Sequence, residues 1–136
     1  MEHTEMKRLI EEHLAAEAKA DLDGCVAMYT DDVVHDVVGA PSGPVSGPDA
    51  AKDFYAYLTA NVSGEAASVN QSWFGDDFCV MEHQWKGTVP GEFLGIPGNG
   101  KPVDFRMLHI WEFKDGKMSR ENVWLDGAAI ISQLTS

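Results

Sequence analysis

The chain has 136 residues, of which 44% are hydrophobic, and this size and composition predict one globular domain over residues 1–136. Its formal net charge of −12 argues against nucleic acid and anionic membrane as partners, because both are bound through clustered lysine and arginine. No apolar run is long enough to span a bilayer and nothing resembles a signal peptide, so we expect a cytoplasmic location.

Helical patterns dominate the first part of the chain. Apolar side chains at helical spacing predict an amphipathic helix over about residues 4–20. His13 lies on or beside its apolar stripe and is interpreted as a packing or surface residue. A short second helix follows the break at residues 21–24, and Asp31 and Asp32 are expected to end it.

A third helix is predicted to begin at Pro48, because proline is favoured at the first helical position. Ser46 or Gly47 would cap it, and it would run to about Ala60. Its expected core residues are Phe54, Tyr57 and Leu58. The two cysteines, Cys25 and Cys79, are interpreted as small buried hydrophobic residues.

Three strands are predicted before the C-terminal hairpin, over residues 33–38, 66–74 and 78–88. In the third of these, alternate residues form an inward face that includes His83 and Trp85. The loop over residues 89–100 is punctuated by glycine and proline, yet it contains Phe93, Leu94 and Ile96. It is either a lid beside a pocket or a loop that packs on the end of the sheet.

Residues 104–126 form a predicted hairpin with its turn at Asp115-Gly116. A two-residue loop would place His109 opposite Asn122, whereas a three-residue loop would place His109 opposite Glu121. We prefer the second register, because it gives one mostly apolar face that carries one imidazole and one carboxylate. That composition is typical of a small-molecule pocket. The predicted face holds Phe105, Met107, His109, Trp111, Glu121, Val123 and Leu125.

Helices followed by a run of antiparallel strands predict an α+β fold with helices against one face of a curved sheet. Several segments stand in a recognisable order: residues 29–35 (YTDDVVH), 47–55 (GPDAAKDFY), 93–106 (FLGIPGNGKPVDFR), 113–118 (FKDGKM) and 124–126 (WLD) with Gln133-Leu134. Together they resemble the SnoaL-like polyketide cyclase family, within the nuclear-transport-factor-two-like superfamily that includes ketosteroid isomerases and limonene-epoxide hydrolases.

The resemblance implies a cone-shaped barrel with the N-terminal helices on its concave face, one deep pocket, and often a homodimer. It implies that His109 is the pocket histidine and that His35 is a polar pocket residue. The acid-base aspartate of the cyclases falls on Val123, which leaves Glu121 as the substitute carboxylate. Asp126 resembles an aspartate that ends the last strand in relatives, but it also stands where a cap for a terminal helix is needed.

His35, His83, His109 and Glu121 are therefore predicted to converge in one pocket and to act by general acid-base chemistry next to a carbonyl group. No cofactor is expected. The alternatives are a non-catalytic carrier of a hydrophobic ligand, an epoxide-hydrolase type of hydrolase, and a metal site built from the three histidines and Glu121. A homodimer is expected through the outer sheet face, which carries Leu108, Ile110 and Trp124. The expected substrate is a hydrophobic small molecule, held by Trp85, Phe105, Met107, Trp111, Val123, Leu125, Phe93 and Tyr57.

Overall fold

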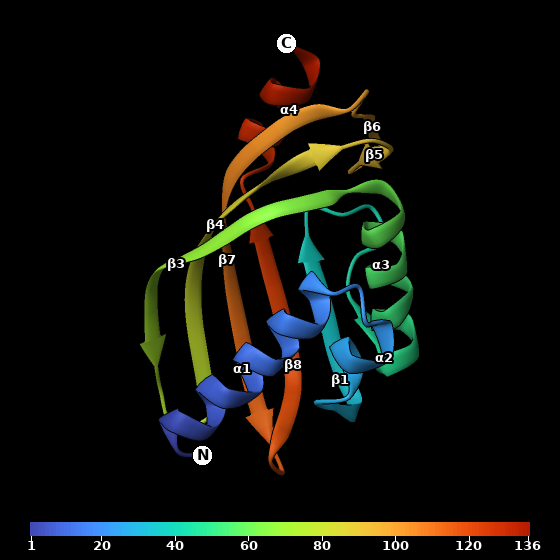
Figure 1. Cartoon of the computed structure of the whole chain (residues 1–136). Helices are drawn as coiled ribbons and strands as arrows, with labels where there is room; N and C mark the ends of the chain where they lie inside the picture. Colours follow the sequence, from blue (N-terminus) through green and yellow to red (C-terminus); the bar gives the residue numbers. More distant parts are fainter.

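The computed structural model describes all residues from Met1 to Ser136 and has an α+β architecture (Figure 1). None of its helices combines the length and apolar character that crossing a membrane requires. The helices are α1 (His3–Ala18), α2 (Leu22–Val26), α3 (Pro48–Asn61) and α4 (Gly127–Thr135). The strands are β1 (Tyr29–Val38), β2 (Val45–Ser46), β3 (Ser63–Phe74), β4 (Phe78–Val89), β5 (Glu92–Phe93), β6 (Ile96–Pro97), β7 (Lys101–Lys114) and β8 (Lys117–Leu125).

Six strands form one curved sheet in the order β2-β1-β8-β7-β4-β3. All neighbours are antiparallel except β1 and β8, which run parallel and join the first strand to the C-terminal hairpin. Figure 1 shows α1 crossing one face of the sheet and α3 standing beside it. The predicted fold class is confirmed, and the concave face between these helices and the sheet is where a cavity can form.

Helix α1 follows its predicted stripe, because its buried residues recur every three or four positions. Met6, Leu9 and Ile10 join a core cluster that includes Met81 and Trp111 of the sheet. The opposite face of the helix is exposed and carries charged side chains. The apolar stripe therefore packs α1 against the sheet. The remaining buried residues of the helix, His13 and Ala16, face the concave interior.

One prediction about local structure is wrong and a second holds only in part. Asp31 and Asp32 do not end α2, because they are exposed positions inside β1, which begins at Tyr29. In α3, Phe54 and Leu58 are half-buried and pack against the core as predicted, but the fully buried residues are Ala51 and Tyr55, and Tyr57 is half-buried outside that core. The predicted cap is confirmed: Gly47 stands at the N-cap with a φ of 92°, a backbone conformation that glycine adopts without strain.

The predicted hairpin register is also wrong, because His109 pairs with Val123 and Trp111 pairs with Glu121. The turn is a two-residue loop that sets Lys114 opposite Lys117. A β-bulge follows at Ser119, where the register shifts between Glu112 and Phe113. The bulge adds one residue to β8, so the side chains beyond it point to the same side of the sheet as predicted. The predicted inward face is therefore kept, and Phe105, His109, Trp111, Glu121 and Val123 are all buried.

The residue 89–100 loop and α4 pack together over one end of the sheet. Phe93 belongs to a second core cluster with Phe105 and with Ile130 and Leu134 of α4, so the loop packs on the end of the sheet. The carboxylate of Asp126 accepts a hydrogen bond from the backbone N–H of Ala129 at 3.1 Å. Asp126 is therefore the N-cap of α4.

Candidate active site

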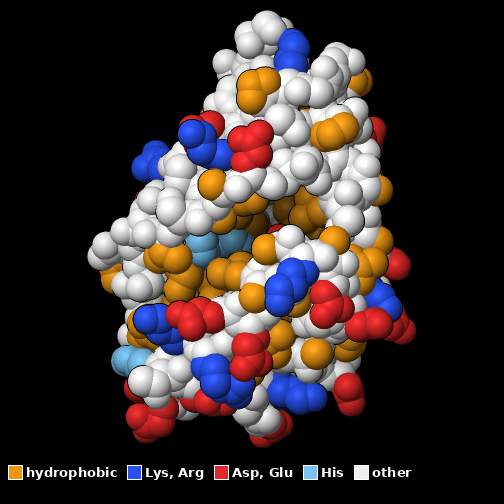
Figure 2. Space-filling view, in the orientation of Figure 1, with side chains coloured by type: hydrophobic (Ala, Val, Ile, Leu, Met, Phe, Trp, Pro, Cys, Tyr) orange, Lys and Arg blue, Asp and Glu red, His pale blue; other side chains and the backbone are white.

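A cavity of about 510 Å³ lies between the sheet and helices α1 and α3. Its volume is within the usual range for small-molecule sites, and 17 of its 24 lining residues are hydrophobic, so it suits an apolar ligand. Figure 2 shows the opening as a hollow in which hydrophobic and histidine side chains are visible. Its charged or titratable side chains are few and lie among apolar ones: Glu17, Cys25, Tyr55, Glu65, His83, His109 and Glu121.

Most of the predicted substrate-binding residues line this cavity. Trp85 and Phe105 pack with ring centroids 5.5 Å apart, and Phe93 meets the edge of Phe105. Two predicted residues do not line it. The Tyr57 hydroxyl donates to Glu92 outside the cavity, and Trp111 is fully buried behind it. The residues placed as predicted are Trp85, Phe93, Phe105, Met107, Val123 and Leu125.

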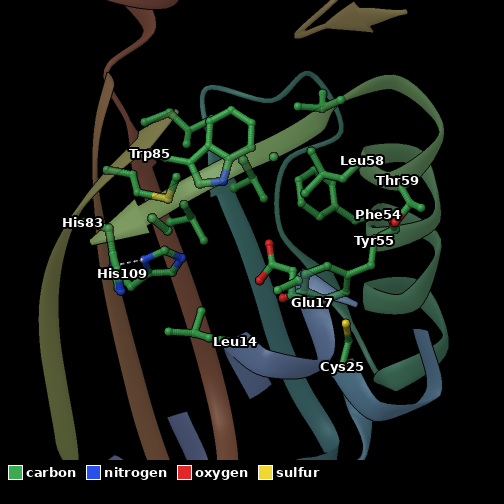
Figure 3. Close-up of a pocket in the computed structure, with 18 of the residues that line it drawn as sticks. Leu14, Glu17, Cys25, Phe54, Tyr55, Leu58, Thr59, His83, Trp85 and His109 are labelled. Carbon is green, nitrogen blue, oxygen red and sulfur yellow. Dashed lines mark hydrogen bonds between the residues drawn. The ribbon is translucent and has the colours of Figure 1, made fainter. Parts of the chain in front are cut away.

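His83 and His109 form a pair on the sheet wall of the cavity (Figure 3). Strands β4 and β7 pair so that the two side chains stand diagonally on one face, and their Nδ1 atoms are 3.1 Å apart. The His109 ring stacks on Trp111 with centroids 4.7 Å apart and planes 4° apart. Burial lowers the pKa of His109 from 6.5 to about 3 and also lowers the pKa of His83, so both imidazoles are neutral near pH 7.

The tautomer of the pair follows from the other nitrogen of His83. His83 Nε2 is buried and has no hydrogen-bond partner, and an N–H group is rarely left in that state. The proton of His83 therefore sits on Nδ1 and is donated to Nδ1 of His109. His109 then carries its own proton on Nε2, which points into the cavity (Figure 3). The pair presents a neutral N–H donor to a ligand.

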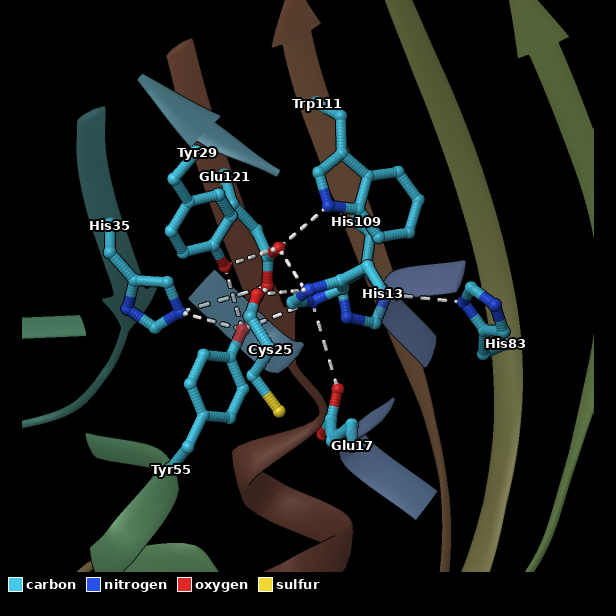
Figure 4. A network of polar contacts seen from close by, with 10 residues as sticks. All are labelled: His13, Glu17, Cys25, Tyr29, His35, Tyr55, His83, His109, Trp111 and Glu121. Atoms are coloured by element: carbon cyan, nitrogen blue, oxygen red, sulfur yellow. Dashed lines mark hydrogen bonds and ion pairs between the residues drawn. The ribbon is translucent and has the colours of Figure 1, made fainter. Parts of the chain in front are cut away.

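Glu121 is the centre of a separate, buried polar network (Figure 4). Its Oε1 accepts hydrogen bonds from Trp111 Nε1 at 2.7 Å and the Tyr29 hydroxyl at 3.0 Å, and its Oε2 accepts from the Tyr55 hydroxyl at 3.0 Å. Two histidines complete the network: His13 Nε2 is 3.1 Å from Oε1, and His35 Nε2 is 3.6 Å from Oε2. The predicted direct pairing of Glu121 with His109 is wrong, because the register places Glu121 beside Trp111.

The charges of this network are fixed by its contacts. Burial alone lowers the pKa of His13, but the neighbouring Glu121 carboxylate outweighs burial and raises it from 6.5 to about 9. Burial raises the pKa of Glu121, but His13 and the hydrogen bonds around it hold that pKa well below 4.5. His13 and Glu121 are therefore a buried ion pair. A carboxylate that accepts hydrogen bonds from this many donors is a weak base.

The sequence prediction missed three side chains of the site: His13, Tyr55 and Glu17. Glu17 lines the cavity from α1, and 36% of its side chain remains exposed. The nearest cationic group is His13 Nε2 at 3.9 Å. Burial raises the pKa of Glu17 above 4.5, although His13 opposes this shift. The only signal in the sequence is the spacing of His13 and Glu17, which is one helical turn.

The predicted site residues therefore fall into two groups and one outlier. His83 and His109 form one group, His35 and Glu121 belong to the other, and Asp126 serves as a helix cap away from both. The structure brings no three His, Cys, Asp or Glu side chains into an arrangement that could hold a metal ion, and the three histidines of the alternative metal site are divided between the two groups. Burial raises the pKa of the Cys25 thiol to about 12, which leaves it protonated in the cavity wall.

The profile that describes SnoaL-like polyketide cyclases matches residues 6–134. Among solved structures, TsrD from Streptomyces laurentii is 18% identical, with a TM-score of 0.84 over 98% of this chain and 97% of its own. An LEH-like epoxide hydrolase from M. tuberculosis is 19% identical, with a TM-score of 0.76 over 97% of this chain and 90% of its own. A protein with a ketosteroid isomerase-like fold from Catenulispora acidiphila is 12% identical, with a TM-score of 0.77 over 93% and 92%. At these identities the likeness to the three structures shows a shared fold.

Proposed function

The chain belongs to the SnoaL-like polyketide cyclase family, and from this premise we propose that it is an enzyme that transfers protons next to a carbonyl group in an apolar small molecule. The reaction class is that of a cofactor-independent cyclase or isomerase. One observation carries the proposal: the 3.1 Å contact between the Nδ1 atoms of His83 and His109 leaves His109 Nε2 facing the apolar cavity, where it can serve as an N–H donor. A carbonyl oxygen is the acceptor that such a donor fits.

A hydrogen bond from His109 would help the reaction because negative charge develops on the carbonyl oxygen when the neighbouring carbon loses a proton. A donor that is already aimed at this oxygen needs no reorganisation as the charge develops. The bond from His83 holds the tautomer, and the stack on Trp111 holds the ring. The apolar lining strengthens the interaction, because it keeps the local dielectric constant low.

The buried network around Glu121 helps to hold the His109 ring in its position. Glu121 fixes the Trp111 indole through the 2.7 Å hydrogen bond, and Trp111 in turn stacks on His109. His35 lies on the far side of Glu121 and is not part of the cavity lining. We therefore assign Glu121, His35 and Trp111 as positioning residues, and His109 with His83 as the pair that acts on the substrate.

The test is conversion of flat apolar ketones and diketones, followed by mass spectrometry, beside binding of the same compounds. Binding is measured by their displacement of fluorescent 2-naphthol, which is a flat mimic of an enol. The proposal predicts that at least one compound is both bound and converted. Tight binding with no conversion of any ketone would instead support a non-catalytic carrier of hydrophobic ligands.

We also propose that the chain forms a homodimer through the outer face of the sheet. Trp124 on that face is 49% exposed, and Leu108 and Ile110 beside it are only half-buried. An apolar surface of this kind favours association. Light scattering at micromolar concentrations is expected to give twice the 14.9 kDa mass of the chain. A monomer mass across that range would exclude the dimer.

A further inference from the structure

Proton transfer next to a carbonyl needs a group that accepts the proton, and His109 does not supply it. In the tautomer set by His83, its cavity-facing nitrogen already carries a proton. Glu121 does not supply it either, because Trp111, Tyr29 and Tyr55 donate to its oxygens. The acceptor must come from another side chain of the cavity.

Two more carboxylates line the cavity, Glu17 and Glu65. Glu65 is an exposed residue of the edge strand β3, so water solvates it. Glu17 projects from α1, on the wall opposite the sheet, and Figure 3 shows its carboxylate facing the side of the cavity where His109 lies. A flat ligand between α1 and the sheet would have Glu17 on one side and the His109 N–H on the other.

Glu17 is also free to react. Its oxygens accept no hydrogen bond from the protein, and its nearest cationic contact is His13 Nε2 at 3.9 Å. His13 itself is committed elsewhere: its Nε2 contacts Glu121 at 3.1 Å and its Nδ1 donates to the Cys25 carbonyl at 2.8 Å. The carboxylate is therefore held near a buried cation without being neutralised by a direct bond.

We propose that Glu17 is the general base, which removes the proton from the carbon next to the carbonyl group that His109 holds. This assignment rests on the proposed function. A Glu17 oxygen takes the proton, and the C–H electron pair becomes the new C=C bond of the enolate. The carbonyl π pair moves to the oxygen, which His109 stabilises. Protonated Glu17 then returns the proton, to another carbon in an isomerisation or to the new alkoxide after an aldol closure.

The test measures deuterium uptake from D₂O at the carbons next to the carbonyl of 2-tetralone. In Glu17→Gln the rate is expected to fall about 100-fold or more, the usual scale for a general base. Affinity for 2-naphthol should change by less than about threefold, because the amide keeps the shape of the side chain and 2-naphthol has no acidic C–H next to a carbonyl group. Glu17→Asp keeps a carboxylate and should retain part of the rate.

Glu11→Gln is the matched control, since it removes the same charge from the exposed face of the same helix. It is expected to exchange as the wild type does. Wild-type exchange in Glu17→Gln would overturn the assignment of Glu17 alone. A loss of 2-naphthol binding and of thermal stability in Glu17→Gln, matched by the loss of rate, would also overturn it in favour of a structural role. No exchange in the wild-type protein would overturn the proposed function itself, and this assignment with it.

Discussion

Replacement of His109 by phenylalanine is expected to lower the rate of carbonyl-directed turnover by about 100-fold or more. Phenylalanine keeps a flat ring that can stack on Trp111, as the imidazole does at 4.7 Å, but it has no N–H to offer the carbonyl oxygen. The cavity should keep its shape and its apolar lining. The loss therefore belongs to the hydrogen bond that forms with the developing negative charge.

The comparison with His109→Gln sharpens this prediction, because the glutamine amide still carries N–H groups and is expected to retain more activity than phenylalanine. Steady-state rates, 2-naphthol affinities and melting temperatures should be measured for both variants. If His109→Phe is folded, binds 2-naphthol normally and turns over within about threefold of the wild-type rate, His109 is not the group that acts on the carbonyl.

Replacement of Glu121 by glutamine is expected to destabilise the protein by about 3 to 5 kcal/mol, the usual cost of removing one partner of a buried ion pair. Glu121 is 1% exposed and lies 3.1 Å from His13, which is fully buried. Without the carboxylate, His13 must either stay charged without a partner or release its proton. Glu12→Gln breaks an exposed pair with Arg8 and should cost far less stability, because water screens the pair. Chemical unfolding of the three proteins measures the difference.

The same ion pair predicts a pH dependence of stability. The folded chain keeps a proton on His13 up to about pH 9, whereas the unfolded chain releases it near pH 6.5, so stability should fall as the pH rises through this window. His109 acts in the opposite sense, because its pKa of about 3 makes unfolding take up a proton below pH 6.5. The melting temperature should therefore be highest near pH 6.5.

In Glu121→Gln the fall in melting temperature between pH 6.5 and 9 should disappear, since the carboxylate that raises the pKa of His13 is gone. The two titrations can be followed separately by the ring-proton NMR signals of His13 and His109. An unchanged alkaline slope in Glu121→Gln would show that His13 does not depend on Glu121 for its charge.

The sequence supported the inward face of the hairpin but not its pairing. Alternation within each strand, together with the preference for a mostly apolar face, places His109, Trp111 and Glu121 on one face, and the observed register differs by two residues, which keeps that assignment. The pairing depends on a two-residue turn and a bulge at Ser119. The turn alone would point the β8 side chains to the opposite face, and the extra residue of the bulge turns them back. Nothing in the local pattern indicates the bulge, so the choice between His109 and Trp111 as the partner of Glu121 could not be made.

The other misses share a cause, which is that the partner of a side chain lies far away in the chain. His13 fits an apolar stripe, and only the packing of α1 over β8 supplies the carboxylate that charges it. In α3 the stripe was placed on Phe54 and Tyr57, but a rotation of about 100° per residue puts Tyr55 inside, where it donates to Glu121. Val123 stands where the resemblance implies the cyclase aspartate, and it is an apolar part of the cavity wall.

Proton NMR of 2-tetralone in D₂O, with the wild-type protein and with His109→Phe, tests directly whether His109 acts on a carbonyl group. The wild-type protein is expected to accelerate deuterium uptake next to the carbonyl above the buffer rate, and His109→Phe is expected to lose most of this acceleration. Displacement of 2-naphthol by 2-tetralone confirms in the same samples that the ketone is bound. A ketone that is bound by the wild-type protein and exchanges no faster than in buffer would contradict the proposed proton transfer.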